Sequence, residues 1–429
     1  MVIDVEQVKR PVAPGSVEAT GLELGVLADL ALKALYFAGN VSGNEVADRL
    51  ALSGPVTTDI LDFLRREHLC EVTGGTGRSQ GTLQYALTRN GIDRTASALD
   101  RSGYVGPVPV PLSAYVDQVE KQSIRNVEFS RQQLEESLSH LILPSRTVDL
   151  VGQAVSAKRA TLLYGASGNG KTSAAEGLRR ALPGLILIPH AIEVRREIIQ
   201  VYDPSTHEAV DVDAAPVDEE ELSRPGMPDR RWVVIRRPAV FAGGELSARH
   251  LDLMLDEVHK TYEAPIQMKA NGGLLVIDDF GRQRLEAVYL LNRWVIPLEQ
   301  HVDYLSLHSG ARFEVPFDAI SLFVTNLDPA ALADDAFLRR IRYKVEVPGP
   351  DAPSFIEILK LECQRNDVAY DDAAASYFMN TYYSNGAREM RGCHPRDIVE
   401  AIADAARYQG HSRALTPAAI DEACANYFV

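Results

Sequence analysis

One stretch of the sequence decides the fold, and it reads Gly165-Ala166-Ser167-Gly168-Asn169-Gly170-Lys171-Thr172. It follows the apolar run Thr161–Tyr164, which predicts a strand, and it precedes Ser173-Ala174-Ala175, where we expect a helix to begin. This is GxxxxGKT between a strand and a helix, the context in which the pattern forms a phosphate-binding loop. A chance glycine-rich turn would not carry both flanking elements.

The residue types in this loop predict a site for ATP and Mg²⁺. Glycines let backbone N–H groups turn inward around a phosphate, and the N-terminus of the following helix adds its dipole. Lys171 would neutralise the β- and γ-phosphate oxygens, and the Thr172 hydroxyl would bind Mg²⁺. The expected ATP-binding residues are Gly165, Ala166, Ser167, Gly168, Asn169, Gly170, Lys171, Thr172 and Ser173.

A second apolar run, Leu274–Ile277, ends in two carboxylates, Asp278 and Asp279. A strand that delivers a carboxylate beside the phosphate loop is what the positioning of Mg²⁺ requires, and we assign that role to Asp278. Asp279 is then the candidate that orients and polarises the attacking water. Two aspartates that merely open a solvated loop would not be expected after so apolar a run.

With these motifs in place, residues 140–429 resemble an AAA+ ATPase. The resemblance implies an α/β fold, with a P-loop core built on a parallel sheet and a C-terminal helical lid. The apolar run Ser321–Thr325 ends in Asn326 and is similar to the sensor-1 strand, so Asn326 takes the sensor position. One departure is that most members have Glu where this chain has Asp279. The shorter side chain would hold its carboxylate further from the water, which predicts slow hydrolysis or hydrolysis only in an assembly.

Two further arginines acquire roles from the same resemblance. The segment Ala336–Ile341 resembles the part that carries the arginine finger, for which Arg340 is favoured and Arg339 is the alternative. Arg396, which lies at the start of an amphipathic helix, looks like sensor 2. The resemblance implies that ATP lies between subunits, with Arg340 supplied by the neighbouring one.

Two insertions, residues 191–250 and 302–316, are longer than the core needs. The second alternates around a Ser-Gly pair, which predicts a hairpin. A hairpin just before sensor 1, together with an insertion after the second strand, resembles the MoxR-like branch of AAA+ proteins. Alternatively, the insertions only cover the core, since loops tolerate additions. Three short segments also look like a bacterial AAA+ family: Phe280–Gln283, Leu290–Trp294 and Asn326–Pro329.

Residues 21–100 predict three helices followed by two strands, an order that resembles a winged helix. The helix that would enter the major groove of DNA contains Asp59 and Asp62, which would face phosphates. Residues 22–99 carry a net charge of −2, and only Arg65, Arg66 and Arg78 are available as DNA contacts. Because winged helices also dock proteins, protein docking is favoured over DNA binding.

Breaks in composition divide the chain into five parts. The expected parts are a flexible arm (1–20), a winged-helix-like domain (21–100), a Pro-rich linker (101–120), the ATPase core (121–347) and the helical lid (348–429). Within the linker, residues 103–111 are expected to be extended, because their alternating prolines resist helix formation.

Composition sets limits on the function. A hydrophobic content of 46% with 24% charged residues is that of a globular protein, which excludes a disordered chain. The net charge of −15 argues against binding nucleic acid by bulk charge. Cysteines are scattered without a CxxC pair, no apolar run is long enough for a membrane span, and no signal peptide opens the chain. We therefore expect a cytoplasmic protein.

The leading hypothesis is an ATP-hydrolysing homo-oligomer, a hexamer-like ring or a filament, that remodels a protein client. A second hypothesis is a DNA-associated ATPase, such as a loader or regulator, that uses the winged helix. A third is a nucleotide-dependent switch that binds ATP tightly and turns it over slowly, which Asp279 would favour.

Overall fold

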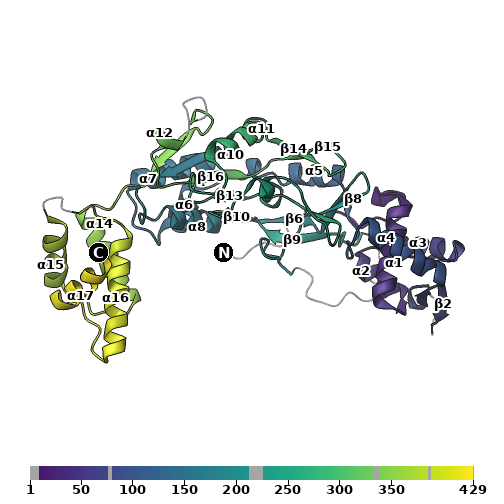
Figure 1. Cartoon of the computed structure of the whole chain (residues 1–429), viewed down its shortest axis with the longest axis horizontal. Helices are drawn as coiled ribbons and strands as arrows, with labels where there is room; N and C mark the ends of the chain where they lie inside the picture. The colour runs from purple at the N-terminus through teal and green to yellow at the C-terminus, as the bar shows by residue number, and fades with distance from the viewer. Residues whose placement is uncertain (1–8, 76–79, 212–225, 333–337, 385–387, 429) are drawn as a thin grey trace.

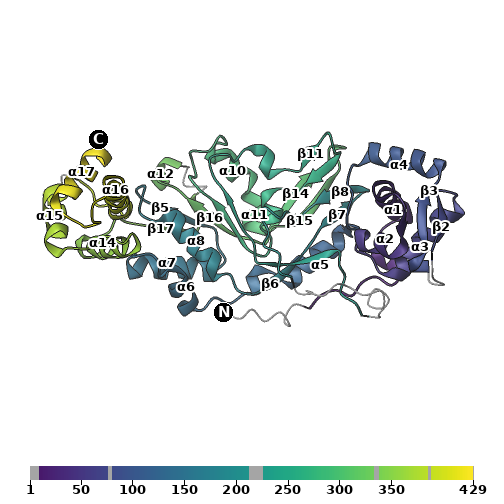
Figure 2. The ribbon, with the colours of Figure 1, turned by 90° about the horizontal axis from the view of Figure 1, so that it is seen from below.

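The computed structural model describes residues 9–75, 80–211, 226–332, 338–384 and 388–428. Figure 1 shows an elongated molecule, with the N-terminal helices at one end, an α/β core in the middle and the C-terminal helices at the other end. The view at right angles in Figure 2 shows the same succession. Within the described residues, no helix is long and apolar enough to cross a membrane.

Five parallel strands form the central sheet, and their apolar runs are explained by burial on both faces. In spatial order they are β10 (Ala239–Ala242), β13 (Leu274–Ile277), β16 (Ile320–Val324), β5 (Thr161–Tyr164) and β17 (Tyr343–Glu346). Every residue of β13 and β16 is buried. Because parallel strands end at one edge, the segments after β5, β13 and β16 meet there. The predicted α/β core with a parallel sheet is confirmed.

Helices cover both faces of this sheet, since side chains alternate along each strand. Leu163 of β5 packs in one cluster with three helices, α6 (Arg131–Leu138), α7 (Ser145–Ser156) and α8 (Lys171–Ala181). Leu162 packs on the opposite face, with α10 (Ala287–Arg293), α11 (Val295–Gln300) and α12 (Pro329–Leu332). Short 3₁₀ turns occur at Glu18–Thr20, Gln80–Thr82, Ile124–Asn126 and Ala248–Leu251.

The two predicted insertions meet in a β-rich subdomain beside the core. Its main sheet has the order β11 (Met254–Asp256), β12 (Thr261–Glu263), β8 (Glu197–Gln200), β7 (Ala191–Val194) and β4 (Val110–Pro111). Two antiparallel pairs join it: β6 (Leu185–Pro189) with β9 (Trp232–Arg236), and β14 (Val302–Ser306) with β15 (Arg312–Pro316). The second pair confirms the predicted hairpin. The short helix α9 (Ile266–Lys269) lies between this subdomain and β13 in the chain.

The second half of the predicted Pro-rich linker (101–120) is a folded part of the β-rich subdomain. Val110 and Pro111 pair with β7, and Leu112–Lys121 forms the helix α5. Tyr115 and Val119 on this helix are buried in the core of the β-rich subdomain. Prolines end at position 111, so nothing in the following amphipathic sequence resists a helix.

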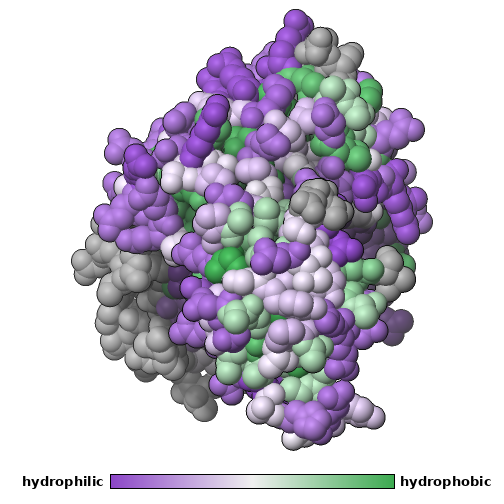
Figure 3. Space-filling view, turned by 90° about the vertical axis from the view of Figure 1, so that its left-hand side faces the viewer, coloured by the Kyte–Doolittle hydropathy of each residue, from purple (hydrophilic) through white to green (hydrophobic). Residues whose placement is uncertain are grey.

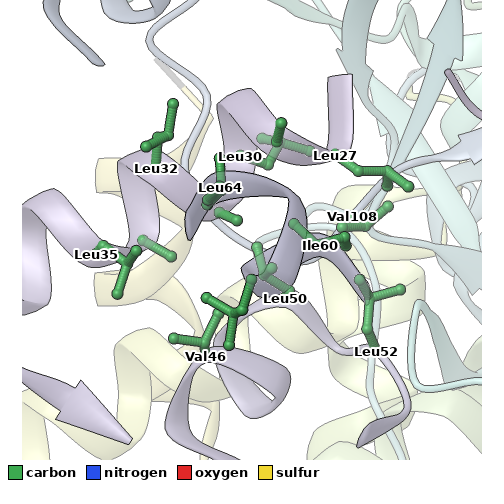
Figure 4. Packing of buried hydrophobic residues seen from close by; sticks show 14 of the residues in the cluster. Leu27, Leu30, Leu32, Leu35, Val46, Leu50, Leu52, Ile60, Leu64 and Val108 are labelled. Carbon is green, nitrogen blue, oxygen red and sulfur yellow. The ribbon is translucent and has the colours of Figure 1, made fainter. Parts of the chain in front are cut away.

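The N-terminal unit consists of helices around a small antiparallel sheet of order β1-β3-β2. Its elements are α1 (Leu24–Ala38), β1 (Val41–Ser42), α2 (Gly43–Leu50), α3 (Gly54–Arg66), β2 (Cys70–Gly74), β3 (Gln84–Leu87) and α4 (Arg89–Arg101). Ser42 caps α2 through a capping box with Glu45, as its position predicts. Figure 4 shows leucines of α1 packed against α2 and α3 in a single core. The three predicted helices and the two strands after them are present, while β1 and α4 were not predicted, and classification as a winged helix stays a prediction.

Arg231 ties the β-rich subdomain to the N-terminal unit, and a buried ion pair with Asp229, two residues before it, holds its side chain in place. Arg231 and Asp229 form a two-point pair, with side chains only 6% and 3% exposed. Arg231 also donates to the carbonyl oxygens of Thr20 and Pro109 at 3.3 and 3.5 Å. The neighbouring Arg230 reaches Asp48 on α2 at 2.7 Å.

The arm predicted to be flexible takes part in the same junction. The backbone N–H of Ala13 donates to the Met227 carbonyl oxygen, and that of Asp229 donates to Pro11, both at 2.8 Å. Residues 9–20 are therefore held in place, which corrects the prediction for that stretch. Such backbone pairing depends on a strand partner more than 200 residues away, so local composition could not reveal it.

Four helices make the C-terminal domain: α14 (Ala352–Arg365), α15 (Asp372–Tyr382), α16 (Cys393–Gln409) and α17 (Pro417–Tyr427). They enclose a core of their own, with Phe355 and Phe378 fully buried. The outer face of this end is largely hydrophilic, with smaller apolar patches (Figure 3). The predicted helical lid is confirmed as a helical domain.

Replacing Arg231 should strongly destabilise the protein, because Arg231→Ala leaves Asp229 buried without its partner. We expect the free energy of unfolding to fall by about 3–5 kcal/mol, measured by denaturant titration. The matched control is Arg236→Ala, whose half-exposed pair with Glu208 should contribute less than about 1 kcal/mol. Equal losses in the two variants would contradict the role of the buried pair.

Candidate nucleotide-binding site

The phosphate loop connects β5 to α8, with the backbone geometry that its glycines permit. Gly165, Gly168 and Gly170 have φ angles of 139°, 85° and 86°. Gly170 is also the N-cap of α8, and no side chain caps this helix end. The first N–H groups of α8 are therefore open to a ligand, and this end of a helix favours anions.

Lys171 lies across the loop that it follows. Its Nζ donates to the carbonyl oxygens of Gly165 and Ala166, both at 2.9 Å. The side chain is largely buried, and this burial lowers the pKa of Lys171, whereas the charges of Asp278 and Asp279 raise it. The ammonium group is thus held among carbonyl oxygens and carboxylates, beside the place where a phosphate would lie.

A cleft of about 350 Å³ opens beside this loop and extends to the C-terminal domain. It brings together most of the predicted site residues: Ser167, Gly168, Asn169, Gly170, Lys171, Thr172, Ser173, Asp278, Asp279, Asn326 and Arg396. Gly165 and Ala166 stand behind it, where their carbonyl oxygens hold Lys171. The roles of these residues remain predictions, but the cleft places them together.

Asp278 and Asp279 follow β13 in a turn that is closed by hydrogen bonds. The N–H of Asp279 donates to the Asp278 carboxylate at 2.9 Å, and Gln283 Nε2 donates to the carbonyl oxygen of Asp278 at 2.7 Å. Asp279 has a φ of 50°, in the left-handed region that Asp and Asn tolerate better than other side chains. The backbone here favours Asp over a longer or branched residue.

Residues suited to Mg²⁺ line the same cleft. The Thr172 hydroxyl and the Asp278 carboxylate supply oxygen ligands, the type that Mg²⁺ prefers. In the described ranges, no group of three or more His, Cys, Asp or Glu side chains could hold a metal ion. This donor set fits an ion that is bound by one or two side chains together with substrate phosphates.

Asn326 has an unsatisfied atom in this cleft. Its Oδ1 is buried and has no hydrogen-bond partner within the described part of the chain. The preceding Thr325 donates from Oγ1 to the carbonyl oxygen of Phe280 at 2.7 Å, which fixes the end of β16 against the Asp279 turn. A buried acceptor without a donor is costly, so a water or a ligand group that donates to Asn326 would be stabilised here.

The cleft also contains residues that the sequence did not reveal, from the C-terminal domain and from the segment before α7. Glu362 and Arg365 of α14 line the cleft and form an ion pair at 2.6 Å. His140 and Leu141 line it from the segment before α7, and burial and the charge of Arg180 lower the pKa of His140. These residues lie far from the motifs in sequence, and an Arg in the last turn of a helix ordinarily indicates a solvated end.

Arg340 lies away from this cleft within its own chain. It borders a separate cavity with Lys158, Arg159, Arg339 and Arg342, and its Nε donates to Glu299 at 2.9 Å. Ala160 and Ala319, which precede β5 and β16, line the same cavity, so it lies at the opposite edge of the sheet from the phosphate loop. A single chain therefore does not bring Arg340 to its own cleft.

The candidate DNA contacts on the N-terminal unit lie in acidic surroundings. Arg65 pairs with Asp62 at 3.4 Å, and Arg66 donates to the carbonyl oxygen of the same residue. Both border a groove of about 970 Å³ that is also lined by four acidic residues: Glu18, Asp59, Asp62 and Glu71. Arg78 lies outside the described residues.

Comparisons with known proteins match parts of this arrangement. Residues 351–426 match a family model described as a domain of unknown function (DUF8689), which covers the C-terminal helical domain alone. No curated protein matches the chain.

Solved structures give a weak similarity. The chain is similar to NtrX from Brucella abortus in complex with ATP (13% identity, TM-score 0.36), with 85% of this chain and 63% of that chain covered. It is also similar to the RuvB Holliday junction branch migration motor of Thermotoga maritima (13% identity, TM-score 0.36; 70% and 72% covered). The chain thus spans less than two thirds of the NtrX chain. Structural similarity this weak gives no information about the activity of the present protein.

The left-handed backbone of Asp279 has a measurable consequence. Asp279→Ala should lower the free energy of unfolding by about 1 kcal/mol relative to Asp279→Asn, because alanine is disfavoured at positive φ whereas Asn tolerates it. Chemical denaturation of the two variants compares them directly. If Asp279→Asn were the less stable variant, the strain assigned to this position would be wrong.

Proposed function

We propose that this protein is an AAA+ type ATPase that binds ATP with Mg²⁺, hydrolyses it and works as a homo-oligomer on a protein client. One observation carries the proposal. A single cleft gathers the phosphate loop, Asp278, Asp279, Asn326 and the lid residue Arg396, from segments spread over more than 200 residues. Structural packing alone gives no reason for two carboxylates, a lysine and an unsatisfied amide to face one cleft.

The phosphate loop binds the triphosphate. Backbone N–H groups of residues 166–172 and the N-terminus of α8 donate to phosphate oxygens, and Lys171 exchanges its loop carbonyls for the β- and γ-phosphates. The metal ion, when bound, neutralises charge that develops on those phosphates. Thr172 and Asp278 hold it in place.

Asp279 and Asn326 act on the attacking water. Asp279 accepts a proton from it or orients it, and Asn326 Oδ1 accepts its second hydrogen bond, which satisfies the buried acceptor. Water then forms the new P–O bond as the bond to the leaving ADP breaks, giving ADP and phosphate. The turn from Asp278 to Gln283 holds the Asp278 carboxylate and the backbone that carries Asp279.

Assembly supplies the arginine finger. Arg340 is at the opposite edge of the sheet from its own phosphate loop, so it serves the cleft of a neighbouring copy. Head-to-tail contacts of this kind generate rings or filaments. In this proposal Glu299 holds Arg340 until the neighbouring cleft is docked.

The N-terminal unit is proposed to dock the client. Four acidic residues border the groove along α3, which disfavours DNA and favours a protein partner. Hydrogen bonds from Arg231 to Thr20 and from Arg230 to Asp48 join this unit to the β-rich subdomain, so client and ATPase would move together.

A slow nucleotide-dependent switch is the second candidate. The observation that favours it is Asp279, whose side chain is shorter than Glu and would hold its carboxylate further from the attacking water. ATP retained through purification with negligible turnover at every protein concentration would favour the switch over the motor.

Lys171→Ala should weaken ATP binding by about 100-fold or more, because it removes the charged donor to the phosphates. Isothermal titration calorimetry with Mg²⁺ and ATP measures this. The control is Lys360→Ala, a half-exposed lysine on α14 outside the cleft, which should bind like the unmodified protein. Unchanged affinity in Lys171→Ala would refute the assignment of the phosphate loop.

Arg340→Ala and Asp279→Asn should each lower the ATPase rate by about 100-fold or more, and mixing them should restore activity. With random assembly at equal amounts, about one quarter of the sites would combine an intact Asp279 with an intact neighbouring Arg340. The steady-state rate per subunit, measured across mixing ratios and protein concentrations, reports this. Recovery with Arg339→Ala but not with Arg340→Ala would transfer the finger to Arg339, and no recovery in either case would count against a shared site.

A further inference from the structure

The first turn of α16 rests directly on the phosphate loop. The N–H of Gly392 donates to Asn169 Oδ1 at 3.3 Å. Gly168 has no room for a side chain, because a Cβ there would lie 2.3 Å from the sulfur of Cys393. Arg396 follows one helical turn later and lines the cleft.

Arg396 is held by the residue that follows it. Its Nε and Nη2 both donate to Asp397 Oδ1, at 3.0 and 2.8 Å. The Arg396 side chain is 55% exposed, so packing alone constrains it weakly. Its position over the cleft therefore depends on where the Asp397 carboxylate points.

The second oxygen of that carboxylate is held by the last helix of the domain. The hydroxyl of Tyr427 on α17 donates to Asp397 Oδ2 at 2.6 Å. The ring of Tyr427 packs at right angles to His394 and close to Phe428, which fixes the hydroxyl. Burial, together with this hydrogen bond, raises the pKa of Tyr427, so the phenol remains a donor at neutral pH.

We propose that Tyr427 is a positioning residue for ATP binding: it locks Asp397, and through Asp397 it holds the Arg396 guanidinium over the phosphate loop. The inference rests on the proposed function, because it takes ATP as the ligand of the cleft. Arg396 binds Oδ1 of Asp397 and Tyr427 binds Oδ2. With Oδ2 held by Tyr427, the carboxylate cannot rotate away from the cleft and carry Arg396 with it. When a phosphate arrives, Arg396 is already within the cleft, and less conformational freedom is lost on binding.

The contact also links α17 to the nucleotide. Tyr427 is 31 residues beyond Arg396 in the chain, yet only the Asp397 carboxylate separates their polar groups. A change in the packing of α17 would therefore alter the position of Arg396 without moving the phosphate loop.

A double-mutant cycle in the full chain tests the proposal. The variants are Tyr427→Phe, Arg396→Ala and the two combined, and the measurement is the dissociation constant of ATP with Mg²⁺ by calorimetry. Tyr427→Phe keeps the ring and its packing and removes the hydroxyl, which contacts Asp397 Oδ2 at 2.6 Å and Cys393 Sγ at 3.6 Å. Tyr408→Phe is the matched control, since Tyr408 lies on α16 and is 94% exposed. Lys171→Ala supplies the reference for lost binding.

We expect Tyr427→Phe to weaken ATP binding about 3- to 10-fold, less than the full effect of a hydrogen bond to a charged group, because Tyr427 acts on ATP only through Asp397 and Arg396. Arg396→Ala should weaken it at least as much, and Tyr427→Phe should add nothing once Arg396 is absent. The Tyr408→Phe control should bind ATP like the unmodified protein.

Three results would overturn the proposal while leaving ATP binding intact: unchanged affinity in Tyr427→Phe, unchanged affinity in Arg396→Ala, or a Tyr427→Phe loss that persists in full without Arg396. The last result would mean that Tyr427 only supports the packing of the helices. If the unmodified chain bound no ATP at all, the proposed function itself would fail, and with it this inference.

Discussion

The close packing of the phosphate loop between two other segments is the constraint on which the rest of the site depends. A Cβ at Gly165 would lie 2.5 Å from the carbonyl oxygen of Val347, and one at Gly168 would meet Cys393. The buried Asn169 joins the same two sides, since its Nδ2 donates to Val347 at 3.4 Å and its Oδ1 accepts from Gly392. Glycine is thus required at these positions because the end of β17 and the start of α16 lie too close for a side chain, in addition to any requirement from phosphate binding.

From this constraint the geometry of the cleft follows. The loop fixes the start of α8, and the neighbouring strands end at the same edge of the sheet, which brings Asp278 and Asn326 beside Lys171. The C-terminal domain then completes the cleft because its helix α16 begins against the loop. The packing of α16 on the phosphate loop is therefore the reason that polar groups of the core and of the helical domain line the same cleft.

The sequence predicted the parts of this site whose information is local. A strand, a glycine pattern and a helix identified the phosphate loop, and an apolar run ending in two aspartates identified the turn after β13. Arg365 and His140 could not be found in this way, because their place in the cleft depends on how the C-terminal domain and the segment before α7 pack. Helix α5 was missed for a different reason. The prolines before it are a strong local signal for a linker, and the amphipathic stretch after them is a weaker signal for a helix.

The junction of the N-terminal unit has a consequence for synthesis of the protein. Apart from Ala191 and Ile198, every buried member of its core precedes residue 109, so this unit can fold early on the ribosome. Its partners at residues 227–231 emerge about 120 residues later, which at the usual pace of translation takes on the order of ten seconds. During that interval the surface that will receive Arg231 is open to solvent, and a nascent chain in this state is a candidate for chaperone binding.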